Sequence, residues 1–445
     1  MLTFKGGIHP PEGKELSEHK PLKRLSLPDQ VIIPLSQHIG APAKAVVQVG
    51  DTVLTGQKIA ESAGTISAHI HSSVTGKVIG IADFPHPVSG RGEAIVIRRE
   101  GEDRFFEYPK YTADSCDRET FLKVVAEMGI VGMGGATFPT HVKLAPPSWK
   151  KVDTIILNGA ECEPYLTCDD RLMQEESEKV ALGLLLMVKN TGAESGVIGI
   201  EHNKPEAYRK MSEACAPYQE LRVEMVKTKY PQGAEKQLID SLTGRKVPAG
   251  GLPLDVGIIV QNVGTAFAVY EAVYEGKPLI ERAVTVSGEG MKETANFIAR
   301  IGDTYERLIN EAGGMREEAA CLISGGPMMG FAQYTPEQLP VLKGTSGILV
   351  MTRKEIPRSE ESPCISCGAC VTACPMKLLP TQLVTLVKNK KYEEAGEMNI
   401  NSCIECGSCA YVCPSKIPLV QYVRLGKGAL RKISARQRAK KEEAK

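Results

Sequence analysis

Eight of the thirteen cysteines fall between positions 364 and 413, in two runs of identical spacing. The first run is Cys364, Cys367, Cys370 and Cys374, and the second is Cys403, Cys406, Cys409 and Cys413. Proline follows the last cysteine of each run, so both runs read C-x2-C-x2-C-x3-C-P. Thiolates at such short intervals are ligands of metals or metal clusters, and in a chain without an export signal they are unlike a disulfide framework.

This spacing is that of bacterial ferredoxins, and it predicts two 4Fe–4S clusters. Two-residue gaps wrap a tight loop around three corners of one cluster, and Gly368 and Gly407 permit the positive φ that suits such a loop. The fourth cysteine lies one helical turn on and points towards the other cluster. One predicted ligand set is Cys364, Cys367, Cys370 and Cys413, and the other is Cys403, Cys406, Cys409 and Cys374.

Structural zinc is the alternative for these cysteines, but zinc sites take four ligands, usually as two separated C-x2-C pairs. Two identical four-cysteine runs fit that pattern poorly, so the sequence predicts a protein that moves electrons. The remaining five cysteines have no ligand spacing and are interpreted as small apolar residues. They are Cys116, Cys162, Cys168, Cys215 and Cys321.

Two stretches near the middle of the chain have the composition of ligand-binding loops. Residues 129–140 read GIVGMGGATFPT, and glycine-rich loops let backbone N–H groups approach a phosphate closely. They follow a predicted helix and not a strand, so a plain flexible loop is an equally good interpretation of the pattern alone. Asn158–Pro164 follows a buried strand, where α/β proteins bind ligands, although an ordinary surface loop is the alternative.

An α/β pattern surrounds these two stretches. Predicted helices cover 119–128, 177–189, 205–215 and 234–242, with a further helix ending at residue 273. Predicted strands cover 152–157, 196–200, 221–227 and 256–260. Strands that alternate with helices indicate a mainly parallel sheet. Another helix is predicted between the cysteine runs, at 379–397, where Leu383, Leu386 and Val387 have helical spacing.

Four separated motifs occur in the order seen in the FMN- and NADH-binding subunit of respiratory complex I. They are Gly132–Lys143, Asn158–Pro164, Tyr230–Glu235 and Gln261–Val263. With the double cysteine run added, nearly the whole chain resembles the C subunits of Rnf complexes, which are ion-translocating ferredoxin–NAD oxidoreductases. The resemblance implies that FMN and NAD(H) bind in the α/β domain.

The resemblance also implies which residues contact the flavin or the nicotinamide. They comprise the glycine loop and its lysine, the polar residues of the second motif, and positions in the two later motifs. The implied contacts are Gly132, Gly134, Lys143, Asn158, Glu161, Glu163, Gly233, Glu235 and Asn262. Ala160 stands where the complex I subunit has an acidic residue and Gln261 where it has asparagine, so the flavin hydrogen bonds need not be the same.

The flanking regions resemble two small domains. Short β runs at 45–49, 65–69 and 76–81, separated by Gly and Asp turns, resemble a biotinyl/lipoyl hammerhead. Where a carrier has its lysine, this chain has Ala68-His69-Ile70-His71, so we expect a structural or docking domain and not a swinging arm. Ordinary surface or half-buried histidines are the favoured interpretation of His69 and His71, with metal binding as the alternative. Residues 281–312 resemble an SLBB domain with a helix at 304–312. The turn at 325–330 either closes over the flavin site or only turns the chain.

Together these features predict a multidomain α/β protein. We expect a β-rich hammerhead-like domain at 1–110, an α/β FMN- and NAD(H)-binding domain at 111–280, and an SLBB-like, ubiquitin-like domain at 281–350. An α-helical, ferredoxin-like domain with two 4Fe–4S clusters follows at 351–425, and a basic tail at 426–445.

The charge and hydropathy of the sequence limit the kinds of partner that we expect. The formal net charge is +1, so the protein has no strong positive electrostatic potential that would attract nucleic acid. No apolar run approaches the ~20 residues needed to cross a bilayer. The chain is therefore not expected to span a membrane, and the resemblance to Rnf C subunits implies a peripheral protein on the cytoplasmic side of the cell membrane, attached through other subunits of an Rnf-type complex. The basic tail is interpreted as a solvated helix, with anionic lipid or an acidic subunit as its alternative contact.

The resemblance implies an oxidoreductase and translocase subunit, in which FMN exchanges hydride with NAD(H) and the clusters relay single electrons. No residue is assigned an acid–base role. A cluster-bearing relay adaptor without nicotinamide binding is the first alternative. The second is the flavin subunit of a soluble NAD-linked hydrogenase or formate dehydrogenase, which the N-terminal β domain and the lack of a fused 2Fe–2S motif disfavour.

Overall fold

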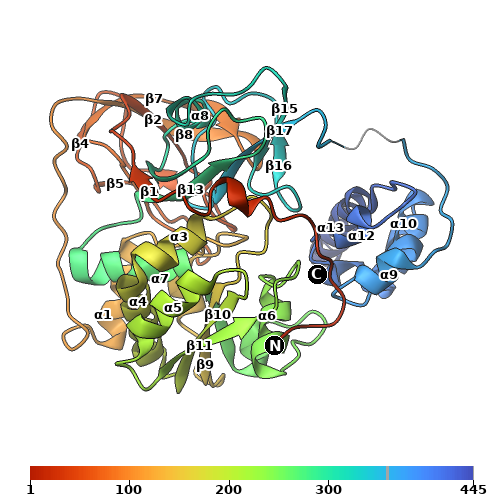
Figure 1. Ribbon diagram of the computed structural model, residues 1–445. Coiled ribbons are helices and arrows are strands. Elements are labelled where there is room, and N and C mark those ends of the chain that lie inside the picture. Colours follow the sequence, from red (N-terminus) through yellow and green to blue (C-terminus); the bar gives the residue numbers. More distant parts are fainter. Residues whose placement is uncertain (357–359, 444–445) are drawn as a thin grey trace.

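The computed structural model describes residues 1–356 and 360–443. Residues 357–359 of the predicted two-cluster domain and 444–445 of the predicted tail lie outside it. The chain forms a β-rich lobe, an α/β lobe and a small helical lobe that carries the cysteine runs (Figure 1). The N-terminal segment runs between the α/β lobe and the helical lobe (Figure 1).

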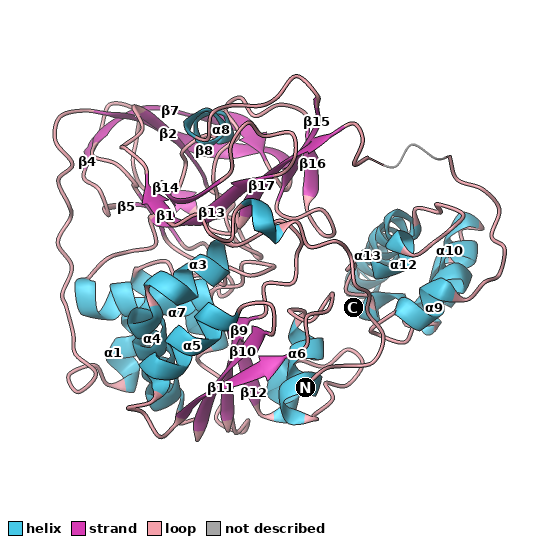
Figure 2. Cartoon of the chain, in the orientation of Figure 1, coloured by secondary structure: helices cyan, strands magenta, loops and turns pink. Residues whose placement is uncertain are grey.

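The first unit of the β-rich lobe consists of two antiparallel sheets (Figure 2). One has the order β2-β8-β7-β4, with β2 (Gln30–Pro34), β4 (Thr52–Val53), β7 (Gly76–His86) and β8 (Gly90–Arg99). The other has the order β3-β5-β6, with β3 (Lys44–Ala45), β5 (Lys58–Glu61) and β6 (Ile70–His71). Alternate residues of β2 and β8, such as Val31 and Ile95, point into the shared core.

Two of the strands predicted for this unit are wrong. The run at 45–49 forms a strand only at Lys44–Ala45, and the run at 65–69 forms none. A turn replaces the second, because Ser67 Oγ accepts from Ala63 N at 3.0 Å and donates to Ala41 O at 2.9 Å. The strand begins instead at Ile70, so His71 is only 1% exposed and is not the surface or half-buried residue expected.

The second unit of the β-rich lobe is a six-stranded sheet of order β1-β14-β13-β17-β15-β16. Its strands are β1 (Leu22–Arg24), β13 (Glu281–Ser287), β14 (Ala295–Arg300), β15 (Ala319–Ser324), β16 (Phe331–Gln333) and β17 (Gly347–Thr352). Helix α8 (Tyr305–Glu311) begins after Thr304, whose Oγ1 accepts from Arg307 N at 3.3 Å. Strand β1 comes from the N-terminal part of the chain, so the two units are tied together by one sheet.

The α/β lobe has a parallel sheet of order β11-β10-β9-β12. Its strands are β9 (Thr154–Gly159), β10 (Ser195–Glu201), β11 (Leu221–Val226) and β12 (Ile258–Asn262). Its helices are α1 (Arg118–Glu127), α2 (Thr140–Lys143), α3 (Cys168–Glu175), α4 (Ser177–Thr191), α5 (Pro205–Cys215), α6 (Glu235–Thr243) and α7 (Val263–Tyr270). All four predicted strands are present, whereas α2 and α3 were not predicted.

The alternation of side chains in β9 explains how both faces of this sheet are covered. Ile155 and Leu157 pack in a large apolar cluster with α1, α4, α5 and α7. Ile156 points the other way and packs with Leu238 and Ile239 of α6. A strand buried on both faces reads as a continuous apolar run, which is the pattern of a parallel sheet between helical layers.

The helical lobe contains α9 (Ala369–Ala373), α10 (Pro380–Lys388), α11 (Tyr392–Glu397), α12 (Ser408–Tyr411) and α13 (Leu419–Glu443). The single helix predicted at 379–397 is wrong, because Lys390 has a left-handed φ of 59° that separates α10 from α11. The last helix, α13, begins in the lobe and continues into the predicted tail. Among the residues described, no helix has both the length and the apolar character needed to cross a membrane.

Candidate functional site

The glycine-rich segment after α1 folds into a closed loop. Gly132 N donates to Phe138 O at 2.9 Å, and Val131 forms a β-bridge with Pro139. These contacts pinch the base of the loop. Near its tip, Gly135 has a φ of 130°, which residues with a side chain rarely adopt, so the loop needs glycine there.

The tip of this loop is held against the start of α7. Met133 N donates to Thr265 Oγ1 at 3.0 Å. Gly134 lies against Asn262, because a Cβ at Gly134 would come 3.0 Å from Asn262 Nδ2. Asn262 itself caps α7, since its Oδ1 accepts from Gly264 N at 2.8 Å. Two predicted contact residues from separate motifs, Gly134 and Asn262, are therefore neighbours.

Asn158 joins the end of β9 to the turn before α6. Its Nδ2 donates to Gly233 O at 2.7 Å, and its Oδ1 accepts from Ala160 N at 3.1 Å. Gly233 has no room for a side chain, because a Cβ would lie 2.1 Å from Ala160 O. With Asn262 at the end of the neighbouring β12, the four motifs converge at the carboxyl edge of the parallel sheet. Open α/β sheets bind their ligands at this edge.

A lysine and a glutamate face each other beside these loops. Lys143 ends α2 and Glu235 begins α6, and Lys143 Nζ lies 2.8 Å from Glu235 Oε1. The side chains are 29% and 39% exposed, so water screens the pair and it contributes little to stability. Both charges are therefore available to an incoming ligand.

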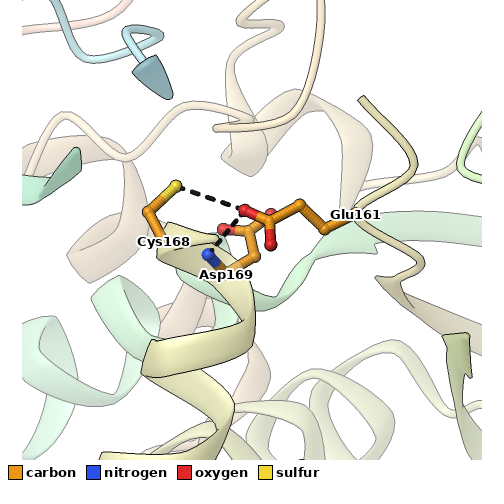
Figure 3. Close-up of side chains that lie close together, drawn as sticks. All are labelled: Glu161, Cys168 and Asp169. Atoms are coloured by element: carbon orange, nitrogen blue, oxygen red, sulfur yellow. Dashed lines mark hydrogen bonds between the residues drawn. The ribbon is translucent and has the colours of Figure 1, made fainter. Parts of the chain in front are cut away.

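Glu161 is buried, and its carboxylate caps α3 (Figure 3). Oε1 accepts from Asp169 N at 2.9 Å, and Oε2 accepts from Asp170 N at 3.3 Å. The thiol of Cys168 donates to Oε1 at 3.5 Å (Figure 3). Burial raises the pKa of Glu161 to about 7, a shift that the Lys14 charge opposes and the Asp169 charge reinforces.

Glu163 faces the turn at 325–330. Its Oε2 accepts from Met328 N at 3.1 Å, and its Oε1 lies 3.3 Å from the hydroxyl oxygen of Tyr230. Gly326 packs so closely that a Cβ would come 2.2 Å from Glu163 Oε2. Burial raises the pKa of Glu163 to about 7, although the hydrogen bond from Met328 N and the nearby hydroxyl of Tyr230 act in the opposite direction. The turn thus closes on the second motif.

Two buried lysines beneath the Asn158–Pro164 loop carried no sequence signal. Lys14 Nζ donates to Glu163 O at 3.0 Å, and Lys204 Nζ donates to Glu161 O at 3.4 Å while pairing with Glu201 Oε2 at 2.9 Å. Both lysines lie outside every motif, and only the folded structure brings them under the loop. Their charge-assisted hydrogen bonds fix the backbone that presents the two glutamates.

The interpretation of Cys162 and Cys168 as small apolar residues is incomplete. Cys162 Sγ accepts from Gly233 N at 3.2 Å, and Ser346 O lies 3.2 Å from Cys168 Sγ as a second acceptor within reach of its single thiol hydrogen. Burial raises the pKa of both thiols, so they remain neutral at neutral pH. They act as hydrogen-bonding groups within the site.

The two cysteine runs fold into the same loop twice. In the first loop Ser366, Gly368 and Lys377 have φ values of 56°, 73° and 57°. In the second loop the equivalent residues Glu405, Gly407 and Lys416 have φ values of 58°, 81° and 51°. Non-glycine residues at positive φ are uncommon, so their repetition shows that both loops meet the same geometric demand.

The lobe gathers four of the eight cysteines around one cavity. Cys374, Cys403, Cys406 and Cys409 line this small apolar cavity, and we call these four the inner set. Of the other four, Cys370 and Cys413 share an apolar cluster, while Cys364 and Cys367 are exposed. We call these four, which the ligand prediction assigns to one cluster, the outer set. The structure thus brings the fourth cysteine of the first run to the three loop cysteines of the second, as the predicted exchange of ligands requires.

The chemistry of these cysteines suits 4Fe–4S clusters. Glu405 N donates to Cys403 Sγ at 3.3 Å in the inner set, and Ser366 N donates to Cys364 Sγ at 3.4 Å in the outer set. Such N–H donors favour the thiolate form that binds iron. Burial, with the charges of the neighbouring cysteines, raises the pKa of Cys409 to about 12, so cluster assembly must displace thiol protons.

The flavin-side residues suit a polar cofactor that carries a phosphate. Within the described ranges, three buried polar atoms of the motifs lack a hydrogen-bond partner: Thr140 Oγ1, His141 Nδ1 and Gln261 Nε2. Buried polar groups are normally paired, so these atoms mark a place where a polar ligand is expected. Gln261 precedes Asn262, and Thr140 follows the glycine loop and opens the helix that ends at Lys143. FMN fits this set of donors.

Four family models match the chain in the order of its units. They are the RnfC barrel sandwich hybrid domain at 2–102, the Nuo51 FMN-binding domain at 125–271, the SLBB domain at 283–332 and the 4Fe-4S dicluster domain at 363–417. The C subunit of the proton-translocating ferredoxin:NAD(+) oxidoreductase complex of Clostridium ljungdahlii is 49% identical over 401 residues, covering 89% of this chain and 87% of the relative. The chain belongs to this family of C subunits.

A second relative in the family is the C subunit of the Na(+)-translocating ferredoxin:NAD(+) oxidoreductase complex of Acetobacterium woodii. It is 46% identical over 399 residues, covering 89% of this chain and 90% of that protein. Among solved structures, the NAD+-reducing NiFe-hydrogenase in the H2-reduced state aligns at 19% identity with a TM-score of 0.49, covering 70% of this chain and 63% of that chain. The family models and the two relatives confirm the predicted membership of the Rnf C-subunit family, its four-part fold and its FMN and 4Fe–4S cofactors.

Proposed function

We propose that this chain is the NAD(H)-linked electron-transfer subunit of an ion-translocating ferredoxin–NAD oxidoreductase, bound peripherally to the membrane on the cytoplasmic side. The two relatives described above are C subunits of proton- and Na(+)-translocating complexes of this class. The observation that carries the proposal is the convergence of all four motifs at the carboxyl edge of the sheet, next to the inner set of cysteines. The cytoplasmic side is proposed because nicotinamide nucleotides are found there.

Each predicted contact residue has a role in this proposal. Gly132 and Gly134 let the loop backbone approach the FMN phosphate. Lys143 exchanges its ion pair with Glu235 for one with the ligand and so supplies a positive charge to the site. Asn158, Gly233 and Asn262 form a hydrogen-bonded frame beside the ring. Glu161 holds α3 in place, and Glu163 holds the turn at 325–330. Bound FMN exchanges a hydride with NAD(H) and passes electrons on singly.

The clusters follow in a fixed order in this proposal. The cluster of the inner set is the redox centre next to the flavin, because Cys406 is hydrogen-bonded to Tyr230 of the α/β lobe. The outer set, with exposed Cys364 and Cys367, is the exit towards another subunit. The working units are residues 1–110, 111–280, 281–350 and 351–425, with the tail at 426–445.

Anaerobic reconstitution of the full chain with iron, sulfide and FMN, followed by titration with NADH, tests the proposal. We expect about eight irons per chain, retained flavin, and bleaching of both flavin and cluster absorbance by NADH. The control is the same chain reconstituted without FMN, which should hold its iron but not respond to NADH. Intact clusters with no flavin and no response to NADH would replace the proposal with the relay adaptor.

A further inference from the structure

A buried tyrosine joins the flavin-side motifs to the inner set of cysteines. Tyr230 is 2% exposed and lies in the turn between β11 and α6. Its hydroxyl donates to Cys406 O at 2.7 Å, and the same oxygen lies 3.3 Å from Glu163 Oε1. One side chain therefore touches the second motif and the backbone of an inner-set residue.

The surroundings of Tyr230 shield these polar contacts from water. Its ring belongs to a buried apolar cluster with Ile8 of the N-terminal segment and Ala373 and Cys406 of the helical lobe. Met328 of the turn at 325–330 packs against the same cluster. Hydrogen bonds in such a low-dielectric environment are stronger electrostatically than hydrogen bonds at the surface.

The N-terminal segment also contacts the junction between the α/β lobe and the helical lobe. Gly7 N donates to Ala373 O at 2.9 Å, and a Cβ at Gly7 would come 2.6 Å from Tyr230 O. A Cβ at Gly6 would come 2.9 Å from Cys374 O. Contacts from the rest of the chain thus reach the backbone of two inner-set residues, Cys374 and Cys406.

We propose that Tyr230 is the residue that positions the inner cluster against the flavin site and raises its reduction potential. The positive end of the tyrosine O–H dipole points at the carbonyl oxygen of Cys406, a predicted ligand of a cluster that gains negative charge on reduction. Hydrogen bonding around the ligands is one of the factors that set the potential of a 4Fe–4S cluster. Gly233 lies in the same turn and Glu235 begins the helix that follows it, so the tyrosine also provides a short bonded route between the flavin and Cys406.

The test variant is Tyr230→Phe, which keeps the ring and removes only the hydroxyl. In the full chain, reconstituted anaerobically with iron, sulfide and FMN, a mediated redox titration followed by electron paramagnetic resonance gives the potential of each cluster. We expect one cluster to become harder to reduce and the other to stay unchanged. In stopped-flow experiments, NADH should reduce the flavin at the wild-type rate, while bleaching of the clusters slows severalfold. This last expectation rests on the proposed function.

Tyr165→Phe is the matched control. Its hydroxyl donates to Glu355 Oε1 at 2.8 Å, so the variant also loses one tyrosine hydrogen bond. Both cluster potentials and both rates should stay at wild-type values.

Each outcome for Tyr230→Phe supports or overturns the inference. Loss of iron from one cluster alone would support it, because the missing contact would then be needed to hold that cluster. Unchanged potentials, or equal shifts of both clusters, would overturn it. The redox titration uses a chemical reductant and does not depend on NADH. Failure of NADH to reduce the flavin would therefore count against the proposed function only, and the measured cluster potentials would still decide the Tyr230 inference.

Discussion

The two cysteine loops share a spacing and a backbone, yet their surroundings differ. In the loop of the outer set, Cys364 and Cys367 are exposed, and Ile365 between them is 68% exposed. In the loop of the inner set, Cys406 is 7% exposed and its carbonyl accepts the hydrogen bond from Tyr230. Solvent exposure and hydrogen bonding tune the potential of a cluster even when its ligands are identical. A repeated motif thus determines what each site binds, and tertiary contacts determine its place in the relay.

Removing one cysteine from each loop has the largest expected effect. Cys406→Ser and Cys367→Ser should each lose one cluster, so that iron falls from about eight to about four atoms per chain. Flavin binding should survive in both variants, because the α/β lobe is unchanged. The two variants should differ in their response to NADH. Cys367→Ser keeps the inner cluster next to the flavin, whereas Cys406→Ser separates the remaining cluster from it.

Iron analysis and anaerobic absorbance spectra measure both effects. NADH should bleach the remaining cluster of Cys367→Ser, and bleach that of Cys406→Ser slowly or not at all, although dithionite reduces both. Unchanged iron in both variants would contradict the ligand assignment. Equal bleaching by NADH would contradict the order of the clusters.

The cysteine loops could be predicted from the sequence because their chemistry is local. Short spacings and a glycine within each run, such as Gly368, already specify a loop around a cluster. The strands of the α/β lobe were also predictable, because runs such as Ile155–Leu157 are buried on both faces. The break at Lys390 was not predictable, since the apolar residues on either side continue the helical pattern.

The flavin side was predictable only in part, because its geometry depends on residues that are distant in the sequence. The resemblance implied flavin or nicotinamide contacts for Glu161 and Glu163, but their sequence did not reveal that one caps α3 and the other accepts a hydrogen bond from Met328 N. Helix α3 was missed because its cap comes from Glu161, outside the helix. Lys14 and Tyr230 act through contacts between segments, which leave no local pattern.

Lys143→Ala should have a smaller effect, confined to the flavin side. A hydrogen bond from a charged group contributes about 1.5–3 kcal/mol, so the affinity for FMN should fall roughly tenfold or more. Titration of the chain with FMN, followed by flavin fluorescence, measures this change. Iron content should stay at the wild-type level, which separates the flavin side from the cysteine loops.

Lys151→Ala is the control for this change, because Lys151 Nζ also lies 2.7 Å from a carboxylate, that of Glu194, but at the exposed surface. Its FMN affinity should equal that of the wild type. If Lys143→Ala also binds FMN as tightly as the wild type, Lys143 is not part of the flavin site.

The smallest expected effect is a change in the pH dependence of stability. Two carboxylates are compared, one on the flavin side and one in a cysteine loop. Burial raises the pKa of Glu161 to about 7, above the value of about 4.3 for an unfolded glutamate. Between these two values the folded chain holds a proton that the unfolded chain has released, so this group lowers stability as pH rises from about 4.3 to about 7. Glu161→Gln removes the titration, and its thermal midpoint should fall less than that of the wild type over this window.

Glu405 provides the opposite case in the loop of the inner set. Burial acts to raise its pKa, but Lys427 and Arg424 outweigh burial and hold the pKa below its ordinary value. Its contribution to stability is therefore present above about pH 4.3 and is lost as pH falls further, so Glu405→Gln should follow the wild-type slope between about pH 5 and pH 7. Thermal unfolding of both variants across this range makes the comparison. If Glu161→Gln also follows the wild-type slope, Glu161 is ionised in the folded chain throughout the window, and the buried lysines beneath its loop compensate its charge fully.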